Sequence, residues 1–116
     1  MKIEDQIAAA LLKAGDLLTI ADLRTLATKG RVQWWGDETV AIGTELMVYP
    51  RRNVLNCFMA AGDIAGVLAL QDRVTDFARQ MQCSHMVAHG QPGWGRVGRA
   101  YGWRPHSVQF VREVPP

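Results

Sequence analysis

The chain has few of the residues that would place it outside a cell or in a membrane. Its 116 residues include two cysteines, Cys57 and Cys83, too few for the disulfide framework of a small secreted domain. No apolar run approaches the ~18 residues that cross a bilayer, and the first five residues are too acidic for a secretory signal. These absences predict an intracellular protein in a reducing compartment, with no membrane partner.

Neither sign of charge is in large excess over the other. The net charge is +2, and residues 79–116 carry five arginines against one glutamate. This local excess is weaker than the dense basic stripes of nucleic-acid-binding proteins. The composition, 48% hydrophobic and 21% charged, is that of a globular protein. A chain of this length buries about two-thirds of its extended surface, so one domain over residues 1–116 is expected.

Two helices are predicted before residue 30. Thr19 and Asp22 have the spacing of a capping box at the start of the second helix. Gly15 and Gly30 follow the two apolar stripes, where a glycine commonly ends a helix. The first stripe comprises Ile3, Ile7, Ala10, Leu11 and Ala14, and the second comprises Ile20, Leu23, Leu26 and Ala27.

The apolar period then changes to two, which is typical of strands. Strands are predicted over residues 31–35, 40–48 and 54–61. The second alternates apolar with polar or small residues, whereas the third is apolar on both faces and is expected in the middle of a sheet. An antiparallel meander is the simplest connection.

The rest of the chain returns to alternating helices and strands. A helix of about five turns is predicted from its N-cap Asp63 to Met81. A strand over 83–89, a short helix over 92–101 and a last strand over 107–112 follow. The order is therefore ααβββαβαβ. A helix between the third and fourth strands predicts parallel pairing, hence a mixed sheet of the α+β (or α/β) class.

Metal and nucleophile patterns are weak. Strand alternation would place Cys83, His85 and His89 on one face, but their spacing matches no zinc pattern and a fourth ligand is lacking. No serine lies in a Gly-x-Ser-x-Gly turn, and Cys57 is expected to behave as a buried apolar residue. No metal site and no hydrolase chemistry are predicted.

The junction at residues 60–66 is the one place where a strand leads into a helix in the manner of an anion site. It contains no lysine or arginine, and the Asp63 carboxylate would occupy the position of the anion. We interpret it as a helix start with its own cap.

Aromatic residues and arginines occur together near residues 31–35 and 94–104. They could stack nucleic-acid bases, but the same mixture is typical of a core edge or a protein interface, which we favour. Trp94 is expected to pack against the sheet. The interface candidates are Trp34, Trp35, Arg51, Arg52, Arg96, Arg99 and Arg104.

Several short sequence motifs occur along the chain in an order that is also found in a family of small proteins. They lie at residues 19–24, 30–35, 48–52, 59–63, 77–79, 82–83, 93–97 and 101–104. In these motifs and in the predicted order of its helices and strands, the chain resembles the small GNAT-like (N-acetyltransferase-like) proteins of tailed phages and prophages. The resemblance covers residues 16–112. It implies two short helices, a strand meander, and a strand–helix unit that binds the acetyl-CoA pyrophosphate in true acetyltransferases.

The resemblance also indicates where the functional residues of the family would fall. The pyrophosphate loop would comprise Ala60, Ala61, Gly62, Asp63 and Gly66. The basic residue of that loop is missing here. The tyrosine that acts as general acid in many members would fall on Gly98, and Tyr101 stands beside the next glycine instead. The general base would be Glu45, although its place in the alternating strand also fits a solvent-facing residue.

Since two landmarks of the family are missing, we expect a protein that acts by binding, without acetyl transfer and without a cofactor. The resemblance implies a component of a phage particle or of its assembly, with phage or prophage proteins as partners, in the virion or the host cytoplasm. The alternative is an acetyl-CoA-dependent N-acetyltransferase acting on an amine of a host or phage protein or a small molecule. A nucleic-acid-binding regulator depends on the C-terminal arginines alone. The oligomeric state does not follow from the sequence.

Overall fold

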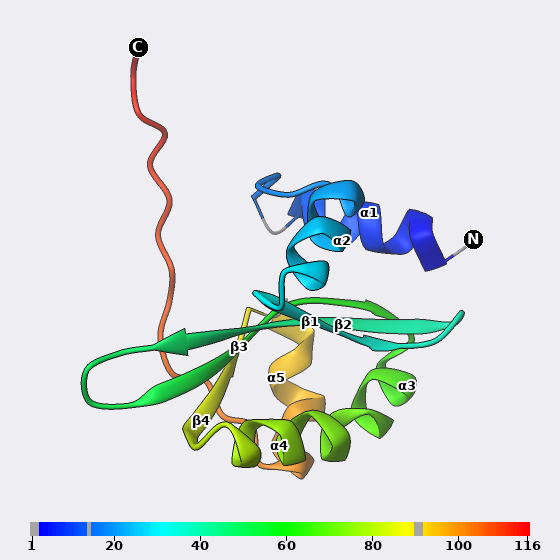
Figure 1. The fold of residues 1–116 in the computed structure, drawn as a ribbon, viewed down its shortest axis with the longest axis vertical. Coiled ribbons are helices and arrows are strands. Elements are labelled where there is room, and N and C mark those ends of the chain that lie inside the picture. Colours follow the sequence, from blue (N-terminus) through cyan, green and yellow to red (C-terminus); the bar gives the residue numbers. More distant parts are fainter. Residues whose placement is uncertain (1–2, 14, 90–91) are drawn as a thin grey trace.

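The computed structural model describes residues 3–13, 15–89 and 92–116 (Figure 1). Apart from the division of one predicted helix into two, its helices and strands follow the predicted order as far as α5. The helices are α1 (Ile3–Lys13), α2 (Ile20–Thr28), α3 (Ile64–Ala69), α4 (Gln71–Gln80) and α5 (Pro92–Gly98), which leads into a 3-10 turn at Arg99–Tyr101. The strands are β1 (Val32–Gly36), β2 (Val40–Val48), β3 (Asn53–Gly62) and β4 (Cys83–Ala88).

The four strands form one mixed sheet in the order β1-β2-β3-β4. The first three are antiparallel, and β3 pairs with β4 in parallel. This confirms the predicted α+β class and the inner position of the third strand. Among the described residues, no helix is long and apolar enough to cross a membrane.

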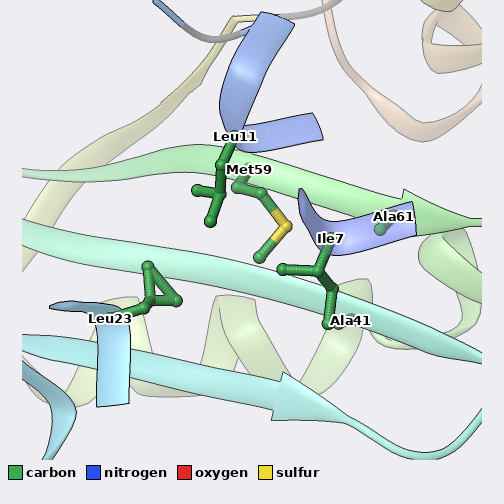
Figure 2. Close-up of a cluster of buried hydrophobic side chains, with 6 residues drawn as sticks. All are labelled: Ile7, Leu11, Leu23, Ala41, Met59 and Ala61. Atoms are coloured by element: carbon green, nitrogen blue, oxygen red, sulfur yellow. The ribbon is translucent and has the colours of Figure 1, made fainter. Parts of the chain in front are cut away.

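Helices cover both faces of the sheet (Figure 1). On one face, α1 and α2 enclose a cluster of buried side chains (Figure 2): Ile7, Leu11, Leu23, Ala41, Met59 and Ala61. On the other face, α3 and α4 enclose a second cluster: Val40, Ile42, Leu55, Val67, Val74 and Ala78. Because alternate strand residues face opposite sides, β2 and β3 contribute to both clusters.

A bulge in β3 changes which residues face each layer. Gly43 pairs with Met59 and Thr44 with Cys57, so Phe58 has no direct partner on β2. Before the bulge, Leu55 packs toward α3 and α4, whereas after it Met59 packs toward α1 and α2. One extra residue thus exchanges the two faces of the strand.

Both predicted helix caps are present. The Thr19 hydroxyl oxygen accepts from the Asp22 amide at 3.1 Å, and the Asp22 carboxylate accepts from the Thr19 amide at 3.0 Å. Asp63 is the N-cap of α3, and its Oδ1 accepts from the Gly66 amide at 2.7 Å. Each carboxylate satisfies an amide that the first helical turn leaves without a partner.

The single long helix predicted from Asp63 to Met81 is wrong, because the structure divides it into α3 and α4 at Leu70. The Leu70 amide donates to the Val67 carbonyl, three residues back, at 3.2 Å. This tighter turn interrupts the α-helical hydrogen bonding. The apolar period continues across the turn, so the sequence pattern did not reveal it.

The last predicted strand is also wrong, and with it the final element of the order ααβββαβαβ. Residues 103–116 have no regular secondary structure and extend away from the sheet (Figure 1). Val108 and Phe110, within the predicted strand, are 76% and 90% exposed. The alternation of apolar and polar residues indicates which side chains would share a face. A strand forms only where a second strand pairs with its backbone N–H and C=O groups.

Candidate functional site

The junction between β3 and α3 is built around Gly62. Its φ is +106°, and a Cβ atom there would lie 2.5 Å from the Thr39 carbonyl oxygen, so only glycine fits. The next residue, Asp63, is exposed and binds the Gly66 amide through its carboxylate. Ala61 is buried in the first cluster and Ala60 is exposed. Close packing therefore accounts for Ala61 and Gly62, and capping for Asp63.

Glu45 lies on β2, half-buried, beside a hollow of about 470 Å³. The hollow is lined by Gly30, Arg31, Glu45, Leu46, Met47 and Val48. The side chain is therefore partly shielded from solvent. Its neighbours in the strand register are Val32 on β1 and Asn56 on β3.

A second hollow, of about 390 Å³, lies over β3 and β4. It is lined by Met47, Tyr49, Val54, Asn56, His85, Val87, His89 and His106. Val54 pairs with His85 and Asn56 with Val87, so the parallel register places these side chains together. Asn56 Oδ1 is buried there without a hydrogen-bond partner in the described structure.

The histidines of β4 do not share a face with the cysteine of that strand. The β3–β4 register shifts after the pair Asn53–Cys83, so that the next pair is Val54–His85. Cys83 packs against the second cluster, whereas His85 lines the hollow. The expected common face of Cys83, His85 and His89 is wrong for this reason. Over the residues described, no three histidines, cysteines or carboxylates gather as metal ligands do.

Gly98, the position at which the resemblance would place a tyrosine, is closely packed against Trp103. It is buried, and a Cβ atom on it would lie 3.0 Å from Cβ of Trp103. The Trp103 indole N–H donates to Gln71 Oε1 at 2.8 Å, and the Trp103 amide donates to the Gly98 carbonyl at 3.0 Å. Tyr101, the nearby tyrosine, is 51% exposed.

Burial raises the pKa of the Cys57 thiol to about 11. The thiol is therefore neutral at physiological pH, as expected for a packed residue. A neutral thiol is a poor nucleophile, so Cys57 is not suited to covalent catalysis.

The proposed interface residues fall into different environments. Trp34 is exposed, whereas Trp35 is half-buried, donates through its indole N–H to Thr44 Oγ1 at 3.0 Å and meets the ring of Phe77 edge-on. Trp94 packs against the second cluster, as expected. The arginine candidates Arg51, Arg52, Arg96, Arg99 and Arg104 are all exposed. The first two lie in the β2–β3 turn and the others around α5 and beyond.

Sequence analysis did not find the hollow over β3 and β4. Tyr49, Asn56 and His106 come from three separate segments and form no motif. The parallel pairing of β3 and β4 was predicted, but the register that brings Asn56 beside Val87 was not. The histidines of β4 were the only available signal.

No protein-family model matches the chain, and no curated protein is similar to it in sequence. Solved structures match it over nearly its whole length. An acetyltransferase of Trypanosoma brucei has a TM-score of 0.66 and 14% identity, covering 98% of this chain and 97% of that one. A mutant form of a Thermus thermophilus protein has a TM-score of 0.68 and 13% identity, covering 97% and 91%.

An enzyme of named substrate is among the similar structures. Glucosamine-6-phosphate N-acetyltransferase of Arabidopsis thaliana has a TM-score of 0.56 and 11% identity, covering 99% of this chain and 95% of its own. At such identities the likeness concerns the fold and not the activity. The helices, the mixed sheet and these neighbours together give this chain the GNAT-like fold of N-acetyltransferases.

Proposed function

We propose that this protein uses a GNAT-like fold for binding, without acetyl transfer. The observation that carries the proposal is Asp63 at the β3–α3 junction, where its carboxylate already holds the Gly66 amide at 2.7 Å. In acetyltransferases of this fold the same junction receives the acetyl-CoA pyrophosphate. Residues 60–66 contain no lysine or arginine to offset the aspartate. These residues do not fit the cofactor.

The electrostatic cost is large compared with the affinity of a cofactor site. A carboxylate about 5 Å from a phosphate charge costs about 3 kcal/mol at an effective dielectric of about 20. A micromolar site has about 8 kcal/mol in total. Because Asp63 is exposed, solvent screens part of this cost, and a loss of about a hundredfold in affinity is its upper limit. The glycine at position 98 supports the same proposal, because the general acid that the resemblance would place there is absent from that position.

Titration calorimetry with acetyl-CoA tests the proposal on the wild type and on Asp63→Asn. Asparagine caps a helix as well as aspartate does, so this variant removes the charge and keeps the fold. We expect no wild-type binding tighter than about 10 μM. Asp16→Asn, in the α1–α2 loop, is the matched control for the change in net charge. Wild-type binding tighter than this limit would contradict the proposal, and binding by Asp63→Asn alone would support exclusion by charge.

We further propose that the protein is a component of a phage particle or of its assembly. Support comes from the resemblance of its sequence motifs to small phage proteins of this fold. Mass spectrometry of purified particles from the source organism tests the assignment. We expect a fixed number of copies per particle, and absence from the particles and their assembly intermediates would contradict it.

Acetyl transfer to an amine is the second candidate. The specific observation in its favour is Glu45 beside a hollow, with the buried oxygen of Asn56 on the neighbouring strand. Incubation with acetyl-CoA and a panel of amines, with Glu45→Gln as control, tests it. Turnover by the wild type that Glu45→Gln abolishes would replace the first proposal with this one.

A further inference from the structure

We propose that the hairpin tip, residues 48–52 at the end of β2 and in the turn to β3, binds the major groove of duplex DNA through Arg51 and Arg52. The inference goes beyond the proposed function, and it concerns a different part of the chain from the C-terminal arginines. It depends on three features of the hairpin tip: its exposure at one end of the sheet, its unpaired positive charge, and its narrow, fixed shape.

The hairpin tip extends past the helices that cover the sheet (Figure 1). Burial along β2 falls toward the tip, from buried at residues 40–44 to exposed at Val48. Val48 and Tyr49 are 71% and 53% exposed, and the other three residues of the tip are exposed as well. The whole tip is therefore accessible to a large partner.

Arg51 and Arg52 carry positive charge that no neighbouring carboxylate offsets. Residues 46–62 contain these two arginines and no acidic residue. Among the described residues, the ion pairs involve two other arginines, on α2 and α4. Glu45 precedes this segment, and it is half-buried beside a hollow that Arg31 also lines. The hairpin tip therefore presents two unpaired positive charges, which attract an anionic partner.

The shape of the hairpin tip is fixed before any partner binds. The Tyr49 amide donates to the Arg52 carbonyl at 3.0 Å, which closes the hairpin. Pro50 lies inside this closed turn, and its ring fixes its φ. Val48 pairs with Asn53 directly below the turn. Because the backbone of the tip is already ordered, binding a partner costs little further conformational entropy.

The dimensions of the hairpin tip suit the major groove of DNA. Paired strands lie about 5 Å apart, and the groove is about 12 Å wide and admits a two-stranded ribbon. Two residues on each side of the turn reach about 7 Å, close to the groove depth of about 8.5 Å. There the guanidinium groups can donate to phosphate oxygens and to guanine edges. A narrow, projecting tip favours such a groove over the flatter surface of an acidic protein.

Fluorescence anisotropy with a labelled DNA duplex of about 20 base pairs tests the proposal through its salt dependence. Each neutralised phosphate contributes about −0.9 to the slope of log affinity against log salt concentration. Two arginines predict a slope of about −1.8, so the affinity should fall about sixtyfold between about 20 and about 200 mM NaCl.

Three double variants locate the contact. Arg51→Ala/Arg52→Ala should bring the slope close to zero and lower the affinity about tenfold or more at the lowest salt concentration. Arg51→Lys/Arg52→Lys keeps the charge and should keep the slope. Arg73→Ala/Arg112→Ala removes the same charge from exposed positions outside the hairpin tip and should bind as the wild type does. An unchanged slope in the first variant, or an equal loss in the third, would overturn the proposal.

Matched probes separate the DNA groove from other anionic partners. The probes are the single strand of the same sequence, the corresponding RNA duplex, whose major groove is too narrow for side chains, and poly-glutamate. We expect the DNA duplex to bind about tenfold more tightly than each of them. Equal binding by the single strand, the RNA duplex or poly-glutamate would overturn the assignment to the major groove. Absence of DNA binding by the wild type at low salt would overturn the whole proposal.

Discussion

Thr44 shows how one polar side chain can organise a buried region. It is fully buried on β2, where its hydroxyl accepts from the Trp35 indole N–H at 3.0 Å and donates to Gln33 Oε1 at 3.0 Å. Both partners lie on β1. Trp35 also meets Phe77 of α4, with ring centroids 5.4 Å apart. One hydroxyl thus fixes the tryptophan that connects the sheet to the helix below it.

Replacing this hydroxyl by a methyl group should destabilise the protein. Thr44→Val keeps the shape of the side chain but leaves the Trp35 N–H without an acceptor, which costs about 1–3 kcal/mol. Thr44→Ser keeps the hydroxyl and removes one methyl group, and should cost about 1 kcal/mol. Urea denaturation followed by tryptophan fluorescence measures both. A valine variant as stable as the wild type would contradict this role of the hydroxyl.

At the scale of the element, the β3–α3 junction combines two constraints in adjacent residues. Gly62 lies close to the Thr39 carbonyl and to Val40 of β2, and Asp63 begins the helix. The close approach lets the end of β3 pair with the start of β2, as in the pair Val40–Gly62. The junction is therefore a tight connection between strand and helix whose residues serve packing and capping. This agrees with the proposal that it binds no cofactor.

Gly62→Ala should be severely destabilising, by more than a positive φ alone explains. A left-handed conformation costs an alanine about 1–2 kcal/mol, and the contact with the Thr39 carbonyl oxygen at 2.5 Å adds a clash. Gly30→Ala is the control, because Gly30 has a φ of +74° but no atom within 4 Å of the added Cβ. Thermal unfolding by circular dichroism compares them. Equal losses in the two variants would show that the close approach at Gly62 has no energetic role.

At the scale of the whole molecule, two apolar layers share one sheet. The first cluster joins α1 and α2 to the sheet, and the second joins α3 and α4 to its other face. Leu23 and Leu55, one in each cluster, are fully buried. Since β2 and β3 contribute to both layers, neither layer can lose its packing without disturbing the strands of the other. The fold should therefore unfold in one cooperative transition.

Leu23→Ala and Leu55→Ala should each cost about 2–5 kcal/mol, the range for a buried leucine that leaves a cavity. Leu17→Ala, at a leucine that is 82% exposed, should change stability by less than about 0.5 kcal/mol. Urea denaturation followed by both fluorescence and circular dichroism should give coincident transitions in each variant. Two separate transitions in Leu23→Ala would instead show that α1 and α2 unfold independently.

Local chemistry in the sequence was enough to predict most elements. The capping box at Thr19 and the cap at Asp63 depend on neighbours within three residues, and the apolar periods identified α1, α2, the four strands and the approximate position of α5. The missing basic residue at 60–66 and the glycine at position 98 were visible for the same reason. Each of these features depends on which residues adjoin one another along the chain.

Tertiary structure decided the remainder. The bulge at Phe58 and the register shift beside Cys83 determine which side chains share a face. Neither irregularity could be predicted from the residue types at these positions. The hollow with Asn56 and His85 exists only because two distant strands pair in one register. Residues 107–112 have the alternating sequence of a strand but form none. A strand needs backbone hydrogen bonds to a second strand as well as an alternating sequence. Contacts between distant segments are set by the packing of the whole chain, which local sequence does not encode.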